Sequence, residues 1–215
     1  PKTGGILALA SSPTYDPNKF VDRFTTEEWT ALVDNPDNPM LNRAIQGLYS
    51  PGSMFKLVMA AAGLETGTIV PQTTAFCSGS ALIYGRRFRC WFEAGHGAVD
   101  LYEAIRHSCN IYFYSIGRRM SVDTIAAYAT YFGLGRRTGI DIPGEREGLV
   151  PTTEWKRRVM KEDWYPGETI SVAIGQGPLQ VTPIQVAAMT AAIANRGTSV
   201  HPRLSLEKPT EAGII

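Results

Sequence analysis

The chain has 215 residues, of which 44% are hydrophobic, enough to bury one sizeable core or one large domain with a small lobe. Its 21 basic and 20 acidic residues give a formal net charge of +1, which excludes a broad basic surface for nucleic acid. No apolar run approaches the ~18 residues that a membrane-spanning helix needs, so we expect any membrane anchor to lie upstream of Pro1.

The first third of the chain predicts a strand, a short helix and a longer apolar helix. Residues 5–11 have the composition of a strand, and the turn formers that follow end it. A short helix is expected around 27–33. A second turn-rich loop leads to Ser50-Pro51-Gly52-Ser53, where Met, Leu and Ala residues predict an apolar helix that Gly63 closes.

Ser53 is a candidate nucleophile, because Lys56 follows it by three residues at the N-terminal end of this helix. Side chains at i and i+3 are surface neighbours, ~5–6 Å apart at Cβ, so the hydroxyl and the amine can meet. A serine hydroxyl needs a base, and burial lowers the pKa of a lysine enough for it to act as one. The S-x-x-K pattern is typical of penicillin-binding proteins and class A β-lactamases, although an ordinary capped core helix would also satisfy it.

Residues 66–99 predict a β-rich excursion with hairpin-like pieces, and a helical stretch opens after it at the N-cap Asp100. Within that stretch, Ser108 and Asn110 form a second candidate pair. A second hydroxyl can relay protons in acyl transfer, and an amide can hold a peptide-like bond. Positions i and i+2 of one helix point to different sides, so we expect one helix to end near Ser108 and another to begin near Asn110. Two helix caps are the alternative interpretation.

The remainder of the chain alternates helices with short extended pieces. Ser121 and Thr152 are N-caps of two further helices, and 169–174 is a β-branched run. Thr182-Pro183-Ile184-Gln185 is a capping box that starts a helix through Ala194, which its small apolar residues predict to be buried. Residues 207–215 are expected to form a polar loop. This uneven mixture favours an α+β or three-layer domain.

All three cysteines and one histidine form a candidate metal site. Cys77, Cys90, His96 and Cys109 are separated by 13, 6 and 13 residues. Three thiolates and an imidazole make a complete tetrahedral zinc site. If Ser108 and Asn110 face one pocket, Cys109 between them points toward the excursion. A Cys77–Cys90 disulfide and three unrelated buried thiols are the alternatives.

Several of these motifs resemble the transpeptidase domain of class B penicillin-binding proteins. They are Tyr49 to Lys56, Ser108-Cys109-Asn110, and Gly175-Gln176-Gly177 through Thr182-Pro183-Ile184-Gln185. The similarity covers residues 2–204, and Thr152 to Lys156 with Trp164 to Ile170 point to the elongation-specific members. It implies a serine β-lactamase-like, three-layer α+β domain. Residues 1–215 would be part of that domain, lacking its C-terminal strands, with 66–99 as an excursion.

The resemblance implies D,D-transpeptidation of peptidoglycan stem peptides. Ser53 would attack the D-Ala-D-Ala carbonyl, Lys56 would be the base, Ser108 a proton shuttle and Asn110 a contact to the substrate amide. A β-lactam would acylate Ser53. Elongation-type relatives are similar in carrying a metal site in the excursion, which implies a structural zinc at Cys77, Cys90, His96 and Cys109 and no organic cofactor.

The resemblance also implies partners, a cellular location and a Lys-Thr-Gly strand that this chain lacks. Expected partners are a membrane glycan polymerase and other elongation-complex proteins, at the periplasmic face of the bacterial inner membrane. The family's Lys-Thr-Gly strand is expected after the buried helix, whereas the match here, Lys2-Thr3-Gly4, precedes the first strand and has no expected catalytic role. The oxyanion hole is therefore incomplete in this fragment. A β-lactamase or β-lactam sensor, and a non-catalytic zinc-stabilised scaffold, remain alternatives.

Overall fold

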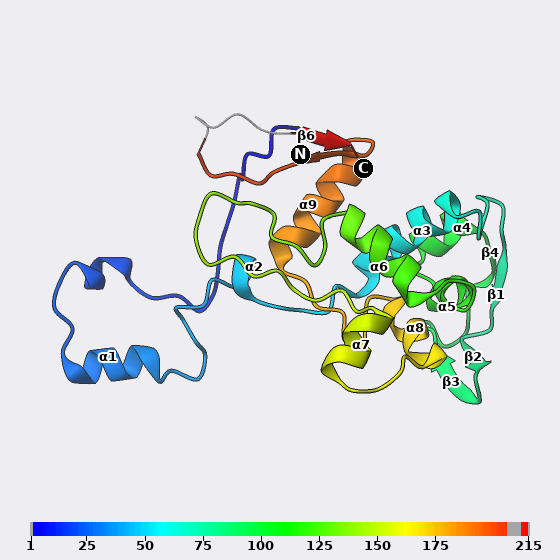
Figure 1. The fold of residues 1–215 in the computed structure, drawn as a ribbon, viewed down its shortest axis with the longest axis horizontal. Helices are drawn as coiled ribbons and strands as arrows, with labels where there is room; N and C mark the ends of the chain where they lie inside the picture. The colour runs from blue at the N-terminus through cyan, green and yellow to red at the C-terminus, as the bar shows by residue number, and fades with distance from the viewer. Residues whose placement is uncertain (1, 206–211, 215) are drawn as a thin grey trace.

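The computed structural model describes residues 2–205 and 212–214, and shows a body of helices from which α1 stands apart on a long loop (Figure 1). The helices are α1 (Thr26–Val33), α2 (Arg43–Gln46), α3 (Lys56–Glu65), α4 (Leu101–Arg106), α5 (Asn110–Gly117), α6 (Val122–Tyr131), α7 (Thr153–Val159), α8 (Pro166–Val172) and α9 (Pro183–Ala194). Two 3-10 helices are η1 (Pro17–Phe20) and η2 (Gly52–Phe55). The strands are β1 (Ala75–Cys77), β2 (Ser80–Ile83), β3 (Arg86–Arg89), β4 (Gly97–Val99), β5 (Thr198–Val200) and β6 (Ala212–Ile214).

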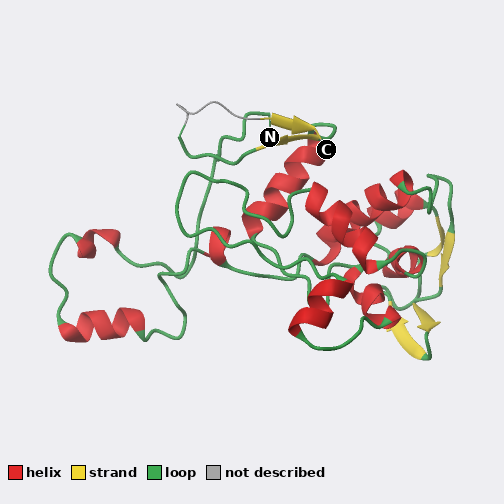
Figure 2. Ribbon diagram, in the orientation of Figure 1, coloured by secondary structure: helices red, strands yellow, loops and turns green. Residues whose placement is uncertain are grey.

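The strands of the described residues form three small antiparallel sheets at the edges of the helical body (Figure 2). Strand β1 pairs with β4, with Ala75 opposite Val99, and β2 pairs with β3, with Ser80 opposite Arg89. These two sheets make up the predicted β-rich excursion. Strand β5 pairs with β6, and beyond β5 the carbonyl of Arg203 accepts a hydrogen bond of 2.9 Å from the Ile6 N–H of the N-terminal segment.

The core lies where α3 packs against α5 and α6. Helix α3 contributes Val58 and Met59, both inaccessible to solvent, and α5 contributes Tyr112 and Phe113. A helix that is apolar on nearly all sides is stable only when it is surrounded, which explains the central place of α3. Burial of these large side chains stabilises the platform from which Ser53 and Lys56 project.

Most of the predicted helices and caps are confirmed. Thr182 Oγ1 accepts a hydrogen bond from the Gln185 N–H, and Gln185 Oε1 accepts one from the Thr182 N–H, so the capping box starts α9 as expected. Asp100 and Ser121 cap α4 and α6. The break near Ser108 is confirmed as well, since α4 ends at Arg106 and α5 begins at Asn110.

Two local predictions in the first third of the chain are wrong. The strand predicted at 5–11 is reduced to a single bridge between Gly5 and Arg203, and Leu7 is fully exposed, because an extended segment becomes a strand only beside a hydrogen-bonded neighbour. Helix α3 continues through Gly63 to Glu65. A Cβ at Gly63 would come within 3.0 Å of Ile69, so this glycine permits close packing and does not end the helix.

Three predictions about the last third of the chain are corrected too. Helix α9 is only half buried, because Ile193 borders an open apolar groove of about 900 Å³ lined also by Leu57, Leu64, Tyr131 and Phe132. The loop predicted at 207–215 contains strand β6, whereas 206–211 and 215 lie outside the described residues. The β-branched run at 169–174 lies mostly in helix α8, which begins at Pro166 with Glu168 as its capping residue.

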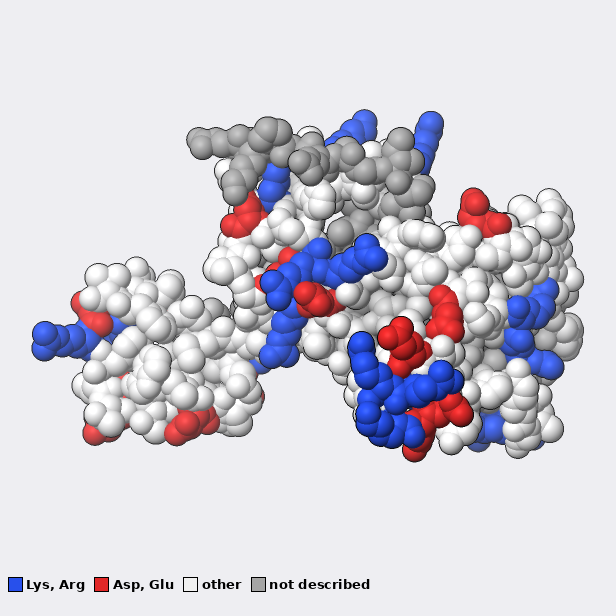
Figure 3. Space-filling view, viewed as in Figure 1, with Lys and Arg blue, Asp and Glu red and all other residues white. Residues whose placement is uncertain are grey.

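Charges of both signs are interspersed on the surface, as Figure 3 shows for one face. Around α7, for example, Arg157 lies 3.0 Å from Asp163. The described residues contain no helix that is both long and apolar enough to cross a bilayer.

Candidate active site

Ser53 lies on a tight turn between a glycine with positive φ and a buried aromatic residue. Gly52 has φ of +55°, a conformation that suits glycine, and it starts η2 directly after Pro51. Phe55 is completely buried and fixes the far end of η2 to the core. The Ser53 side chain is exposed between these two points, so a substrate can reach its hydroxyl.

The four predicted catalytic residues form one hydrogen-bonded group, with the Lys56 amine at its centre. Its Nζ lies 3.2 Å from Ser53 Oγ, 2.9 Å from Ser108 Oγ and 2.7 Å from Asn110 Oδ1. Ser108 Oγ donates to Ser53 Oγ over 2.9 Å. The predicted proximity of these side chains is therefore confirmed, and it places two hydroxyls and an amine within hydrogen-bond distance of each other, as proton transfer between them would require.

The environment of Lys56 makes it a stronger candidate base. Its side chain is only 3% exposed, and its Nζ lies 5.7 Å from the centre of the Phe113 ring. Burial disfavours the charged amine and lowers the pKa of Lys56 from 10.5 to about 8. With that pKa, roughly one amine in ten is neutral at pH 7 and able to accept the proton of Ser53.

The α4–α5 junction turns Ser108 and Asn110 toward Lys56. Ser108 has φ of +51°, a left-handed conformation that few non-glycine residues adopt and that is often found at functional sites. Lys56 Nζ also donates to the Ser108 carbonyl over 2.8 Å, which holds the junction against α3. Asn110 Nδ2 donates to the carbonyl of Arg89 at the end of β3, so the excursion supports the same side chain.

A contact that the sequence does not reveal lies behind the nucleophile. The Gly52 N–H donates to the Gly175 carbonyl over 3.0 Å, and a Cβ at Gly175 would fall 2.1 Å from the Gly52 oxygen. Gly175 follows α8, whose start is fixed by Glu168 accepting hydrogen bonds from the fully buried Lys156. The Gly175-Gln176-Gly177 motif thus supports the Ser53 turn through close backbone packing.

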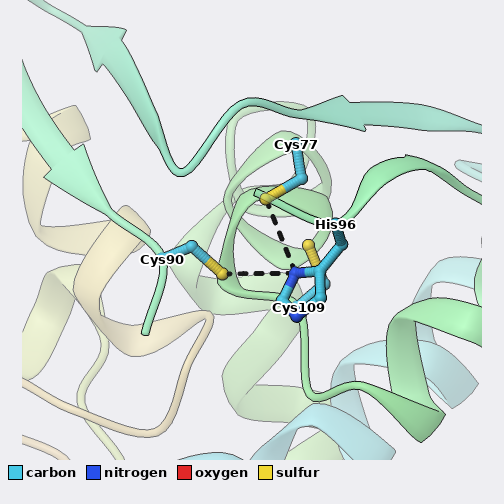
Figure 4. A group of neighbouring side chains, drawn as sticks. All are labelled: Cys77, Cys90, His96 and Cys109. Atoms are coloured by element: carbon cyan, nitrogen blue, oxygen red, sulfur yellow. Dashed lines mark hydrogen bonds between the residues drawn. The ribbon is translucent and has the colours of Figure 1, made fainter. Parts of the chain in front are cut away.

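The predicted metal-binding residues are also brought together. The ligand atoms of Cys77, Cys90, His96 and Cys109 all lie within 4.8 Å of one another (Figure 4). His96 Nδ1 points between the sulfurs of Cys77 and Cys90 and lies 3.6 Å from each. Zinc bonds of ~2.3 Å to sulfur and ~2.0 Å to nitrogen, set at tetrahedral angles, separate such atoms by about 3.6 Å. The donor set and its spacing therefore fit a zinc ion.

All three thiols are free and buried, which disfavours the sequence-based alternative of a Cys77–Cys90 disulfide in this structure. Burial raises the pKa of Cys109 to about 12, so a metal would have to displace a tightly held proton there. Cys109 connects the two groups, because it lies between Ser108 and Asn110 and its side chain points to the cluster while theirs meet Lys56.

The sequence is similar to that of a known protein family over nearly its whole length. Residues 1–212 match the family model described as the penicillin binding protein transpeptidase domain. A peptidoglycan D,D-transpeptidase MrdA from Acinetobacter baumannii is 44% identical over 206 residues, which are 95% of this chain and 31% of that protein. The chain thus spans about a third of the length of the curated relatives it matches.

Two solved structures have closely similar folds. Pseudomonas aeruginosa PBP2 in complex with WCK 5153 superposes with a TM-score of 0.91 and 38% identity, covering 100% of this chain and 49% of that one. PBP2 of Helicobacter pylori, in its complex with MreC, gives a TM-score of 0.91 and 36% identity over 95% of this chain and 38% of the other.

Proposed function

The chain belongs to the penicillin-binding protein transpeptidase family, and from this premise we propose that it carries the acylating residues of a D,D-transpeptidase that cross-links peptidoglycan stem peptides. Its fold is the penicillin-binding transpeptidase fold, mixed in helices and strands. One observation carries the proposal: Lys56 Nζ, buried and with a lowered pKa, lies within hydrogen-bond reach of Ser53 Oγ, Ser108 Oγ and Asn110 Oδ1.

The first half of the reaction acylates Ser53. Neutral Lys56 accepts the hydroxyl proton, and Ser53 Oγ attacks the carbonyl of the penultimate D-alanine. The Ser53 backbone N–H, in η2 directly before α3, stabilises the negative charge that develops on the carbonyl oxygen. Ser108 passes a proton to the leaving amine, so that the terminal D-alanine departs and the acyl group stays on Ser53. A β-lactam mimics the scissile bond and stops at this ester.

The hydrogen bonds of the site support transpeptidation over β-lactamase chemistry. Within the described part of the chain, no carboxylate is hydrogen-bonded to Ser53, Lys56, Ser108 or Asn110. Class A β-lactamases use a glutamate to activate the water that releases the acyl group. An ester at Ser53 without such a base should persist until an amine attacks it.

A labelled penicillin tests this proposal on the full-length protein. We expect a stable adduct, mapped to Ser53 by peptide mass spectrometry and absent from a Ser53→Ala variant. Rapid release of the label would indicate a β-lactamase. The absence of any adduct, in a protein whose thermal unfolding shows that it is folded, would support the non-catalytic scaffold.

The rate of that acylation should depend on pH through Lys56. The neutral amine is the base, and its fraction rises as the pH approaches the Lys56 pKa of about 8. Below pH 8 the second-order acylation rate constant should therefore increase by about tenfold per pH unit and then level off. Stopped-flow measurements between pH 6 and 9 check this, and a flat profile would contradict the role of Lys56.

We also propose that the cluster of Cys77, Cys90, His96 and Cys109 holds one structural zinc ion, and that no organic cofactor is needed. A closed set of four protein ligands is typical of structural zinc, whereas catalytic sites keep a position open. The zinc would supply a rigid link between β1, β3 and the α4–α5 junction. Its residues take no direct part in the acyl transfer.

Partners and a location are proposed from relatives in the same family. MreC accompanies PBP2 in the Helicobacter pylori complex. We propose that this chain likewise works with elongation-complex proteins, among them a membrane glycan polymerase, at the periplasmic face of the bacterial inner membrane. A membrane anchor outside the present sequence would keep it there. Co-purification of the full-length protein with the polymerase from solubilised membranes tests this.

A further inference from the structure

His96, the one histidine of the Cys/His cluster, has a second ring nitrogen without a polar partner. Its Nδ1 is turned toward the cluster and lies 3.6 Å from the sulfurs of Cys77 and Cys90 (Figure 4). Its Nε2 is buried and forms no hydrogen bond with any described residue. A metal-binding histidine almost always donates this second N–H to a carboxylate, a carbonyl or water, which fixes the ring. In this protein the ring of His96 must be held in another way.

Three rings surround the imidazole of His96 and hold it by packing. The ring centre of Phe92 lies 5.3 Å from that of His96, and the centres of Trp91 and His107 each lie 5.5 Å from it. His107 is stacked on His96, with 23° between the two ring planes. We call these three residues the aromatic cover. It replaces the usual hydrogen-bond partner of the ligand with apolar contacts.

The aromatic cover is itself fixed to the end of α4. Trp91 Nε1 donates to the carbonyl of His107 over 2.9 Å. The His107 ring is held by Glu103, whose Oε2 lies 2.9 Å from His107 Nε2 and whose Oε1 lies 3.4 Å from Arg106. These contacts restrain both Trp91 and His107, so that water can reach His96 only if they break or the rings rotate.

The aromatic cover lies between the cluster and solvent. Trp91 is 63% exposed and Phe92 is 42% exposed, although both rings contact His96. The three cysteines are almost inaccessible, which leaves His96 as the least buried of the four cluster residues. The apolar surroundings of a metal site control the access of solvent to it. An incoming water or chelator would therefore meet the aromatic cover first.

We propose that the aromatic cover of Trp91, Phe92 and His107 sets the rate at which the cluster exchanges zinc. The proposal rests on the zinc site proposed above. The cover has to open before another ligand can replace His96, so that both release and uptake of the ion are slow. It offers His96 no acceptor that would make Nδ1 a stronger ligand, and it should therefore affect the rates much more than the affinity.

Slow exchange has a consequence for the catalytic residues. Cys109 belongs to the cluster and lies between Ser108 and Asn110, whose side chains contact Lys56. An ion that stays bound over many reaction cycles keeps this junction in one position. The aromatic cover thus acts on the active site indirectly, through the time for which the cluster holds its ion.

The kinetics of zinc release test the aromatic cover in the full-length protein. The zinc-loaded protein is mixed with an excess of a pyridylazo chromogenic chelator, whose absorbance reports the released ion. For Trp91→Ala we expect the first-order rate constant of release to rise about tenfold or more, since losing a partner of a metal ligand typically has effects of 10- to 100-fold. The equilibrium affinity, from competition with a chelator of known strength, should stay within about threefold of the wild type, because uptake accelerates as well.

Two further variants separate the ring from its surroundings. Trp91→Phe keeps a ring against His96 and loses only the bond to the His107 carbonyl, so its release rate should stay within about threefold of the wild type. Tyr102→Ala removes an exposed aromatic residue that lies on α4 but outside the aromatic cover, and should release zinc at the wild-type rate.

An unchanged release rate in Trp91→Ala overturns the proposal. A loss of affinity as large as the gain in release rate overturns it too, because Trp91 would then hold the ligands in place without slowing exchange. A wild-type protein that contains no zinc refutes the metal site itself. The penicillin adduct at Ser53 tests the transpeptidase function separately, so these failures can be told apart.

Discussion

Replacing Lys56 with methionine is expected to lower the rate of Ser53 acylation by penicillin about 10³-fold, since a positioned general base contributes 10²- to 10⁴-fold. Methionine has a similar length and suits the buried site, but it can neither accept the Ser53 proton nor donate to Ser108 and Asn110. The measurement is the second-order rate constant with a labelled penicillin, at pH 8, for the full-length protein.

Arginine at the same position is the matched control. A Lys56→Arg variant keeps a cation and its hydrogen-bond donors, but a guanidinium does not lose its proton in the accessible pH range. If Lys56 acts as a base, both variants should be slow, and the rise in rate below pH 8 should vanish in both. Near-normal acylation in Lys56→Arg would show that the residue only organises the site, and would contradict the proposed proton transfer.

The local part of the active site could be predicted from the sequence because it depends on the geometry of one turn. Ser53 and Lys56 are three residues apart, and the periodicity of a helix brings them together. The break between Ser108 and Asn110 followed from the same periodicity, since one regular helix could not present both side chains. Residue spacing alone can therefore predict the contacts of a site between residues that are close together in the sequence.

The contacts between segments that are far apart in the sequence were harder to predict. Ser53 Oγ and Ser108 Oγ belong to residues 55 positions apart, and only the family resemblance indicated that they meet. The support from Gly175 to Gly52 and the buried pair of Lys156 and Glu168 were missed. In the sequence, only the Gly175-Gln176-Gly177 motif indicated such contacts. Its glycines allow another backbone segment to approach closely, but they do not identify that segment.

The errors in the fold have a related cause. The strand expected at 5–11 has a suitable composition, but composition does not supply the neighbouring strand that would complete its hydrogen bonds. The helix at α9 has the small apolar residues of a buried helix, and Ile193 nevertheless lies beside an open groove. Propensity describes what a segment can form, and its burial depends on which other segments cover it.

Removing the proposed zinc is expected to destabilise the protein and to slow acylation together. Structural zinc contributes an apparent ~10–16 kcal/mol in small domains, comparable with the whole stability of a domain. For Cys90→Ser we expect less than a tenth of the wild-type zinc content and a melting temperature lower by about 10 °C, equivalent to several kcal/mol. Metal analysis and thermal unfolding of the full-length protein measure both, with Thr74→Ala, an exposed change in the same excursion, as the matched control.

The link to acylation comes from Cys109, which lies between Ser108 and Asn110 and is completely buried. Without the metal, this residue loses its fixed position, and Ser108 has to keep its left-handed φ of +51° through its hydrogen bonds to Lys56, Ser53 and the Ile105 carbonyl. We therefore expect the acylation rate constant of Cys90→Ser to fall, although position 90 has no role in the chemistry. A native protein without zinc, in which peptide mapping finds Cys77, Cys90 and Cys109 all as free thiols, would refute the metal site, and a mapped Cys77–Cys90 link would indicate a disulfide in its place.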